Sequence, residues 1–413
     1  MSDTLTVWLH GQEIGSLQRR RRGASFRYSD DLIDSSRDLP LLSVALPVRP
    51  ESFDARQTAN WFTGLLPEDQ QLLEAMRRFR LVEGDYLSLL AEIGWECAGA
   101  VLTLPARMQH RTGSLQPLDN EELAERLKAL PARPFDPEAA LRVSMGGFQA
   151  KMLVTLTDDG WALPLEGAMS THILKPQPQT QWPGLVESEA WAMTAAAKVT
   201  PTAAVRLLRI GDAPVTLAVT RFDRSGTGDG LRRLHQEDAN QAMGLSPQAK
   251  YASAGPPSRK DPSLGRIAQI LERHSTEPEE QLTRLLQQAT VNVAVGNTDA
   301  HAKNYGLLHP TPGTVELSPL YDVAPTIIIN PGMPQMGLRV NNILLLDRIR
   351  GSSLVDEAAS WGLNRRTARS TTEEALLALQ DGIASATERY PQPGERLAHF
   401  VKQRIDGLLA SLT

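Results

Sequence analysis

Residues 296–304 read Gly296-Asn297-Thr298-Asp299-Ala300-His301-Ala302-Lys303-Asn304 and follow an apolar run, Val291–Val295. A carboxylate and a carboxamide therefore lie five residues apart, with a histidine and a lysine between them. Phosphoryl transfer needs a carboxylate to orient the attacking hydroxyl and oxygen ligands for Mg²⁺, and kinase catalytic loops carry Asp and Asn at this spacing. Taken alone, the stretch also fits a capped helix end followed by a solvated loop.

Two further residues complete the pattern. Asp322 lies among the apolar residues of Leu317–Pro325, where a carboxylate is costly unless it pairs or binds a cation. Lys175 ends the β-rich segment Thr171–Lys175 and is placed to neutralise phosphates in a cleft. The alternatives are a turn aspartate before Pro325 and a solvated strand-end lysine.

A glycine-containing segment, Ser144–Lys151, precedes the predicted strand Met152–Thr157. Glycines let backbone N–H groups approach a phosphate closely, although the spacing is not that of a Walker A loop. Alone, the segment also fits a tight turn. Its position ahead of Lys175, Asp299–Asn304 and Asp322 is the order of parts in a kinase.

Composition excludes several classes. The 413 residues carry 43 Lys and Arg against 48 Asp and Glu, a net charge of −5, which argues against a surface coated with nucleic-acid-binding charge. The sole cysteine, Cys97, excludes an internal disulfide and fits a reducing compartment. Because neither a secretory signal nor an apolar run of roughly 18 residues is visible, we expect a cytoplasmic protein without a membrane span.

The pattern along the chain predicts an α/β (α+β), protein-kinase-like two-lobed fold. We expect a β-rich N-terminal accessory subdomain over 1–137, a nucleotide-binding lobe on an antiparallel sheet over 138–235 and a mostly helical catalytic lobe over 236–413. The first boundary is set at the proline-rich stretch Pro131–Pro137.

Three local features are also predicted. Leu41–Val48 is a candidate extended segment, and Thr276 with Glu279 forms a capping box before a helix. The run Arg19–Arg22 fits a solvated hairpin turn better than a DNA contact.

The segments Ser144–Lys151, Thr171–Lys175, Arg221–Arg224, Gln236–Asp238, Asn297–Asn304 and Tyr321-Asp322 together resemble the HipA family, the kinase toxins of HipA–HipB toxin–antitoxin modules. The resemblance is strongest over about 140–325, and Thr298–Asn304 is its most specific part. The N-terminal and C-terminal parts are compatible with the family by weaker motifs, length and order.

The resemblance implies ATP and Mg²⁺ as cofactors and assigns roles at matching positions. Asp299 would be the catalytic carboxylate, Asn304 and Asp322 the metal ligands, and Ser144 an autophosphorylated serine whose modification inactivates the kinase. The remaining nucleotide-binding positions would be Gly146, Gly147, Phe148, Gln149, Ala150, Lys151, Lys175, Thr220, Arg221, Phe222, His301, Lys303 and Tyr321.

The resemblance also implies partners. These are a HipB-like helix-turn-helix antitoxin, DNA contacted indirectly through it, and a protein substrate, an aminoacyl-tRNA synthetase such as glutamyl-tRNA synthetase, whose phosphorylation arrests growth and gives persistence. Thr220 departs from the family, which often has Glu there, and Phe148 and Ala150 replace smaller or more polar residues. Two alternatives stay open: a catalytically weak co-repressor that binds the antitoxin, and a small-molecule kinase.

Overall fold

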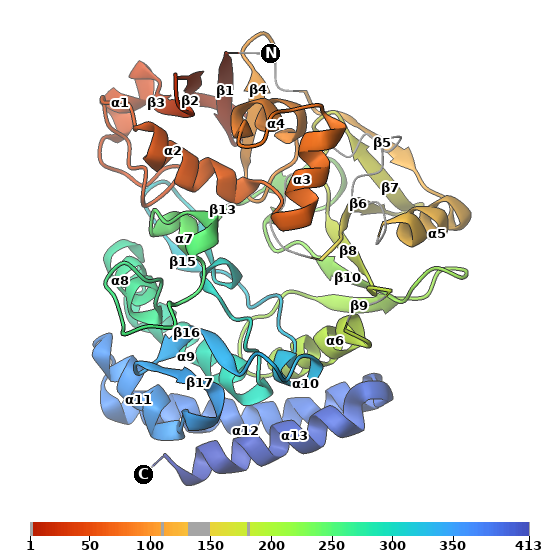
Figure 1. Cartoon of the computed structure of the whole chain (residues 1–413), viewed down its shortest axis with the longest axis vertical. Helices are drawn as coiled ribbons and strands as arrows, with labels where there is room; N and C mark the ends of the chain where they lie inside the picture. The colour runs from red at the N-terminus through yellow and green to blue at the C-terminus, as the bar shows by residue number, and fades with distance from the viewer. Residues whose placement is uncertain (1–2, 109–110, 131–148, 180–181, 413) are drawn as a thin grey trace.

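The computed structural model describes residues 3–108, 111–130, 149–179 and 182–412. Its first part, residues 3–108, is called the N-terminal unit and lies at one end of the molecule (Figure 1). An antiparallel sheet in the order β3-β2-β1-β4 forms its base. The strands are β1 (Thr4–Leu9), β2 (Gln12–Arg19), β3 (Ala24–Tyr28) and β4 (Val101–Pro105). The helices are α1 (Asp30–Ser36), α2 (Ala55–Phe62), α3 (Asp69–Arg78) and α4 (Tyr86–Ile93), with a 3₁₀ turn η1 (Thr63–Leu65).

Aromatic packing holds the helices of the N-terminal unit on its sheet. Phe26 on β3 lies 6.1 Å from Phe53 and 5.4 Å from Phe62, ring centre to ring centre. α2 begins at Asp54, whose carboxylate accepts the Gln57 N–H, so a capping box fixes where the helix starts. The chain then leaves α2 through η1 and Pro67 into α3. This turn brings the start of α3 to a central cavity that residues of the 297–304 loop also line.

The middle unit is a six-stranded antiparallel sheet in the order β5-β7-β6-β8-β10-β9. Its strands are β5 (Ser114–Pro117), β6 (Met152–Thr157), β7 (Gly160–Leu165), β8 (His172–Pro176), β9 (Val205–Leu208) and β10 (Thr216–Thr220). Two helices accompany it, α5 (Asn120–Ala129) and α6 (Leu185–Ala196). β5 pairs with β7, and Leu123 and Leu127 of α5 pack in one core with Met152 and Leu174. Both β5 and α5 precede residue 137, yet they join the sheet and core that follow it.

The C-terminal unit is mostly helical and covers the far end of the molecule (Figure 1). Its helices are α7 (Ala239–Ala242), α8 (Leu264–His274), α9 (Pro278–Val295), α10 (Thr326–Ile329), α11 (Gly351–Ser360), α12 (Arg365–Arg389) and α13 (Pro391–Ala410). Its strands are β11 (Arg224–Ser225), β12 (Arg232–Arg233), β13 (His235–Asp238), β14 (Gly306–His309), β15 (Glu316–Leu317), β16 (Gln335–Val340) and β17 (Ile343–Leu345). Short 3₁₀ turns complete it: η2 (Gly228–Gly230), η3 (Pro247–Ala249), η4 (Ala302–Asn304) and η5 (Leu346–Arg348). Across the described ranges, no helix is long and apolar enough to cross a membrane.

A buried ionic cluster joins the N-terminal unit to the other two. Glu96, just after α4, lies 3.0 Å from Arg221, 2.8 Å from Arg224 and 2.5 Å from Arg233. Asp223 adds a second carboxylate, 2.7 Å from Arg221. Burial opposes ionisation of Glu96, but the guanidiniums of Arg233, Arg224 and Arg221 outweigh it and lower its pKa to about 2. We call these five residues the Glu96 cluster.

The architecture is mixed α and β, as the sequence predicts, with a four-stranded sheet and its helices in the N-terminal unit and a mostly helical C-terminal unit. Two local predictions are wrong. Leu41–Val48 forms only an isolated bridge between Ser43 and Leu46, because its backbone N–H groups donate within turns and to the Glu237 carboxylate instead of to a neighbouring strand. α9 begins at Pro278, with Glu277 as its N-cap and no side-chain cap, because the fixed φ of proline suits the first helical position.

The basic run predicted as a hairpin turn is one. β2 ends at Arg19, β3 begins at Ala24, and Arg21 and Arg22 are exposed between them. Arg19 pairs with Asp85, 3.0 Å away. The predicted boundary at Pro131–Pro137 lies outside the described residues.

Candidate active site

The loop that follows α9 is fixed along its whole length. Gly296 ends the helix with a φ of +75°, a left-handed conformation that glycine adopts without strain. The Asn297 Nδ2 then donates to Asn292 Oδ1 at 2.8 Å, and the Thr298 N–H donates to Thr326 Oγ1 at 2.7 Å. The helix and these bonds present residues 299–304 to a central cavity of about 940 Å³.

Asp299 and Asn304 meet in this loop. The Asn304 Nδ2 donates to the Asp299 carbonyl oxygen at 3.0 Å, which joins the two ends of the five-residue spacing. The Tyr251 hydroxyl donates to Asp299 Oδ1 at 2.6 Å. Burial raises the pKa of Asp299, and the Tyr251 hydrogen bond opposes that rise. A carboxylate with a raised pKa is a better proton acceptor near neutral pH.

Lys175 connects the two sides of the cavity. Its Nζ lies 2.8 Å from Glu189 Oε1 on α6 and 2.6 Å from Asp322 Oδ1. Burial alone would raise the pKa of Asp322, but the Lys175 ammonium outweighs it and holds that pKa well below its usual range. Asp322 also has a φ of +57°, which is uncommon for a residue other than glycine and typical of functional sites.

An apolar slot continues the cavity past Lys175. Ile173, Val219, Phe222 and Tyr321 line it, and the Phe222 and Tyr321 rings lie 5.3 Å apart. Thr220 ends β10 and Arg221 follows it, and both line the cavity. Since the Arg221 guanidinium belongs to the Glu96 cluster and its backbone N–H donates to the Thr171 carbonyl oxygen at 2.9 Å, Arg221 can offer a ligand only its carbonyl oxygen.

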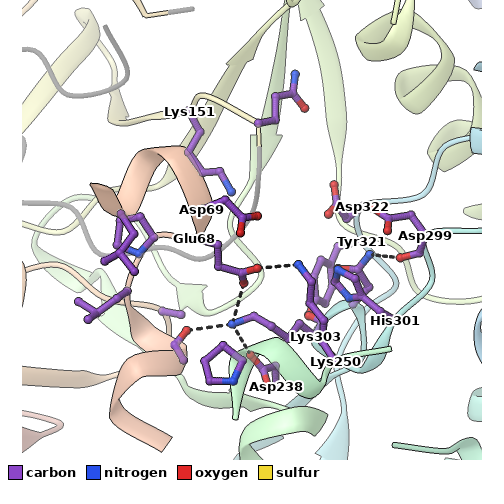
Figure 2. Close-up of a pocket in the computed structure, with 18 of the residues that line it drawn as sticks. Glu68, Asp69, Lys151, Asp238, Lys250, Asp299, His301, Lys303, Tyr321 and Asp322 are labelled. Atoms are coloured by element: carbon purple, nitrogen blue, oxygen red, sulfur yellow. Dashed lines mark hydrogen bonds and ion pairs between the residues drawn. The ribbon is translucent and has the colours of Figure 1, made fainter. Parts of the chain in front are cut away.

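The Lys303 side chain of the loop reaches toward Glu68 and Asp238 (Figure 2). The His301 ring instead packs edge-on against the Tyr251 ring. Burial lowers the pKa of His301 to about 3, so its ring is neutral in the cavity. The Lys303 ammonium lies 3.1 Å from Glu68 and 3.4 Å from Asp238. The Tyr321 hydroxyl donates to the Lys303 carbonyl oxygen at 2.7 Å. Lys303 thus lines the cavity while its charge is directed at the N-terminal unit.

The glycine segment is described only in part. Ser144, Gly146, Gly147 and Phe148 lie outside the described residues. Gln149 and Lys151 line the cavity, whereas Ala150 packs against the core of the middle unit. Burial lowers the pKa of Lys151 to about 8, and the nearby Lys175 ammonium adds to this effect.

Sequence reasoning missed three residues of the site. The sequence could have indicated Glu189, because it is a charged residue on an alanine-rich helix whose apolar face is buried. No sequence pattern indicated Tyr251 or Glu68, since each contacts the loop 296–304 from a distant part of the chain. Among the described residues, no group of three or more His, Cys, Asp and Glu side chains has the arrangement of a metal site.

Comparisons with known proteins identify the family. Residues 143–383 match the model of the HipA-like C-terminal domain, and residues 5–104 match that of the HipA N-terminal domain. The chain therefore belongs to the HipA family, whose members include serine/threonine kinase toxins, as the resemblance of its motifs indicated.

Individual relatives cover most of the chain. The Y4mE protein of Sinorhizobium fredii is 36% identical over 83% of this chain and 82% of its own length. The serine/threonine-protein kinase toxin HipA of Shewanella oneidensis is 26% identical over 86% of this chain and 83% of its own. A solved Shewanella oneidensis complex of HipA, HipB and operator DNA contains a chain with a TM-score of 0.82 and 25% identity, covering 99% of this chain and 96% of that one.

Proposed function

We propose that this chain is an ATP- and Mg²⁺-dependent protein serine/threonine kinase that acts as the toxin of a toxin–antitoxin pair. The observation that carries the proposal is the convergence of Lys175, Asp299, Asn304 and Asp322 on one cavity, from three separate parts of the chain. Membership of the HipA family supports it.

Asp299 would act on the substrate hydroxyl. Its raised pKa and its place in a rigid loop suit a group that orients the hydroxyl and accepts its proton as phosphate transfers. Lys175 would contact the ATP phosphates, and Glu189 would hold the lysine in place from α6. This lysine–glutamate pair is the arrangement that kinases use beside the phosphates.

Asn304 and Asp322 fit a magnesium site. Their oxygens are hard ligands, and Mg²⁺ commonly takes one or two protein oxygens and completes its shell with water and substrate phosphates. The Asn304 Nδ2 is engaged with the Asp299 carbonyl, so Oδ1 would be its ligand atom. When bound, the ion neutralises charge that develops on the transferred phosphoryl group.

The nucleotide would lie along the apolar slot. Backbone groups of Thr220, Arg221 and Phe222 would contact adenine, with His301 and Tyr321 lining the site and Lys303 at its edge. The segment 146–151 would cover the phosphates. Phosphorylation of Ser144 would add nearly two negative charges beside that segment and so repel ATP, which provides self-inactivation.

The proposed substrate is an aminoacyl-tRNA synthetase, such as glutamyl-tRNA synthetase, whose phosphorylation blocks translation and gives growth arrest and persistence. The proposed partner is a HipB-like helix-turn-helix antitoxin, through which the chain would lie near operator DNA. The likeness to the Shewanella HipA complex supports this partner. A cytoplasmic location fits these partners.

Asp299→Ala tests the proposal, with Asp159→Ala in an exposed turn as the matched control. Both variants and the wild type are expressed in bacterial cells, and phosphorylated proteins are quantified by mass spectrometry. We expect new phosphoserine or phosphothreonine with the wild type and Asp159→Ala, growth arrest with both, and neither effect with Asp299→Ala.

Other outcomes would contradict the proposal. Nucleotide binding with no transfer, and toxicity that survives Asp299→Ala, would favour a co-repressor. Transfer to sugars or aminoglycosides but to no protein would favour a small-molecule kinase. An unmodified Ser144 in a chain that phosphorylates other proteins would remove only self-inactivation.

A further inference from the structure

The N-terminal unit contributes the Glu68 carboxylate to the wall of the active-site cavity. Glu68 lies in the turn between η1 and α3, and its side chain is only 10% exposed. Its Oε2 is 2.6 Å from Lys250 Nζ and its Oε1 is 3.1 Å from Lys303 Nζ (Figure 2). Burial opposes ionisation of Glu68, but the two ammonium groups outweigh it and lower its pKa to about 2.

Lys303 is surrounded by acceptors of the protein. Its Nζ donates to the Gly64 carbonyl oxygen at 3.2 Å and lies 3.1 Å from Glu68 and 3.4 Å from Asp238. The ammonium group thus has one hydrogen bond and two ion pairs, all with groups of the protein. Two of the three acceptors come from the N-terminal unit. Lys303 directly precedes Asn304, and Glu68 therefore restrains the metal-ligand end of the loop.

Lys250 restrains the other end. Its carbonyl oxygen accepts the Ala302 N–H at 3.0 Å, and the next residue, Tyr251, donates its hydroxyl to Asp299. The Tyr251 ring also lies edge-on to His301, 5.0 Å away between ring centres. Glu68 thus holds two segments that flank the Asp299 carboxylate.

We propose that Glu68 is a positioning residue of the active site, through which the N-terminal unit holds the catalytic loop in its working geometry. This inference rests on the proposed kinase function. Glu68 touches neither Asp299 nor Lys175 among the contacts of the described residues; it acts through Lys303 and Lys250. The N-terminal unit is then part of the catalytic apparatus as well as an accessory domain.

An opposite role is physically conceivable and gives an opposite result. If Glu68 held two lysines away from the ATP phosphates, its removal would free them and increase both nucleotide affinity and rate. The three acceptors around Lys303, all within the protein, argue for positioning. The sign of the rate change separates the two roles.

The test replaces Glu68 by glutamine, which keeps the shape and removes the charge. Glu74→Gln is the control: this residue lies on α3, six positions after Glu68, and its pairing with Arg77 at 3.8 Å is exposed. Phosphate transfer from [γ-³²P]ATP to the chain itself and to dephosphorylated casein is measured over a range of ATP concentrations. Thermal melting and the Mg-ATP dissociation constant are measured on the same samples.

We expect Glu68→Gln to lower kcat by about 10- to 100-fold, the usual cost of losing a group that orients catalytic residues. The KM for ATP and the Mg-ATP dissociation constant should change less than about threefold, because the Lys175 side of the cavity is untouched. Glu68→Asp, which keeps the charge with a shorter reach, should recover part of the rate. Glu74→Gln should match the wild type.

Three results would overturn the inference: an unchanged or faster Glu68→Gln enzyme, a loss of rate explained by the unfolded fraction, or a Glu68→Asp variant as slow as Glu68→Gln. The results that would contradict the proposed kinase function are different ones. If wild type and Asp299→Ala transfer phosphate equally, the kinase assignment is wrong and this inference falls with it. If Asp299→Ala is inactive while Glu68→Gln is normal, only the role of Glu68 is wrong.

Discussion

Glu68 and Glu96 both belong to the N-terminal unit, and each meets cations from the rest of the chain. Glu96 is surrounded by three guanidiniums in a junction where the side chains of Glu96, Arg221 and Arg224 are at most 6% exposed. Glu68 meets two ammonium groups at the wall of the cavity, with side chains 7 to 13% exposed. Both carboxylates have a pKa of about 2.

The difference is what the cations are attached to. Arg221 follows β10, Arg224 begins β11 and Arg233 ends β12, and none of their guanidiniums contacts a group proposed for phosphate transfer, so the Glu96 cluster joins domains. Lys250 and Lys303 are next to Tyr251 and Asn304, so the Glu68 contacts reach the groups proposed to act in phosphate transfer. We therefore expect similar ionic contacts to serve stability at Glu96 and activity at Glu68.

The largest expected effect is on stability. Glu96→Gln leaves three buried guanidiniums with Asp223 as their remaining carboxylate, and removing one partner of a buried ionic cluster typically costs about 3 to 5 kcal/mol. We expect the free energy of unfolding, measured by urea denaturation, to fall by that amount. The transfer rate per folded molecule should stay within about twofold of wild type.

Glu92→Gln, one helical turn earlier on α4, is the control for this variant and should leave the free energy of unfolding within about 0.5 kcal/mol of wild type. A Glu96→Gln chain that is stable but inactive would contradict the division of roles between the two carboxylates.

The second prediction concerns acid. Glu96 has a pKa of about 2 in the folded chain against 4.5 for an ordinary glutamate, so the unfolded chain takes up the proton first as pH falls. Its stabilisation is present above pH 4.5 and is lost as pH falls toward 2. A shift of this size corresponds to about 3 kcal/mol. Because pH 3 still lies above the folded pKa, only part of this is lost there: urea denaturation at pH 5 and pH 3 should show a loss in the wild type that exceeds the loss in Glu96→Gln by about 2 kcal/mol, and equal losses would contradict it.

The smallest expected effect is on the pH dependence of activity and concerns Tyr251, the neighbour of Lys250. Tyr251→Phe removes the hydroxyl that lowers the pKa of Asp299, so that pKa rises further and the carboxyl stays protonated to higher pH. We expect the acid limb of the kcat/KM profile to move to higher pH and the rate at pH 7 to fall about 2- to 10-fold.

The control is Tyr390→Phe, because the Tyr390 hydroxyl has no hydrogen-bond partner among the described residues. Stability should be unchanged in both variants. An acid limb that stays in place in Tyr251→Phe would show that this hydroxyl does not influence the base.

Much of the site was predictable because its parts are local in sequence. Asp299 and Asn304 share one loop, and the apolar run before them is the helix α9 that positions them. Lys175 was found because it ends a short β-rich segment, and Asp322 because a carboxylate among apolar residues needs a partner. Their convergence followed from the order of parts along the chain.

The rest depended on contacts between distant segments. Glu68 lies 182 residues from Lys250 in sequence, and its own neighbours indicate only the start of a helix. The Glu96 cluster likewise joins residues more than 100 positions apart. The glycine segment could be proposed from sequence alone, but Ser144 and residues 146–148 lie outside the described part of the chain.

The domain limits can be refined on the same grounds. We propose that the N-terminal domain ends near Pro105 and that the nucleotide-binding lobe begins at β5, instead of after residue 137. β5 and α5 pair and pack with the middle unit, and the HipA N-terminal family model stops at residue 104.

The helix that carries Glu189 packs closely on the C-terminal unit. A Cβ added at Gly382 of α12 would lie 2.2 Å from the Ala195 carbonyl oxygen of α6, so the two helices touch backbone to backbone there. The Trp191 Nε1 donates to Thr387 Oγ1 at 3.1 Å in the same contact. An outward swing of α6 that separated Glu189 from Lys175 would break this packing. We therefore expect α6 to stay in place. A change in the width of the active-site cavity would then come from movement of the strands of the middle unit across α6.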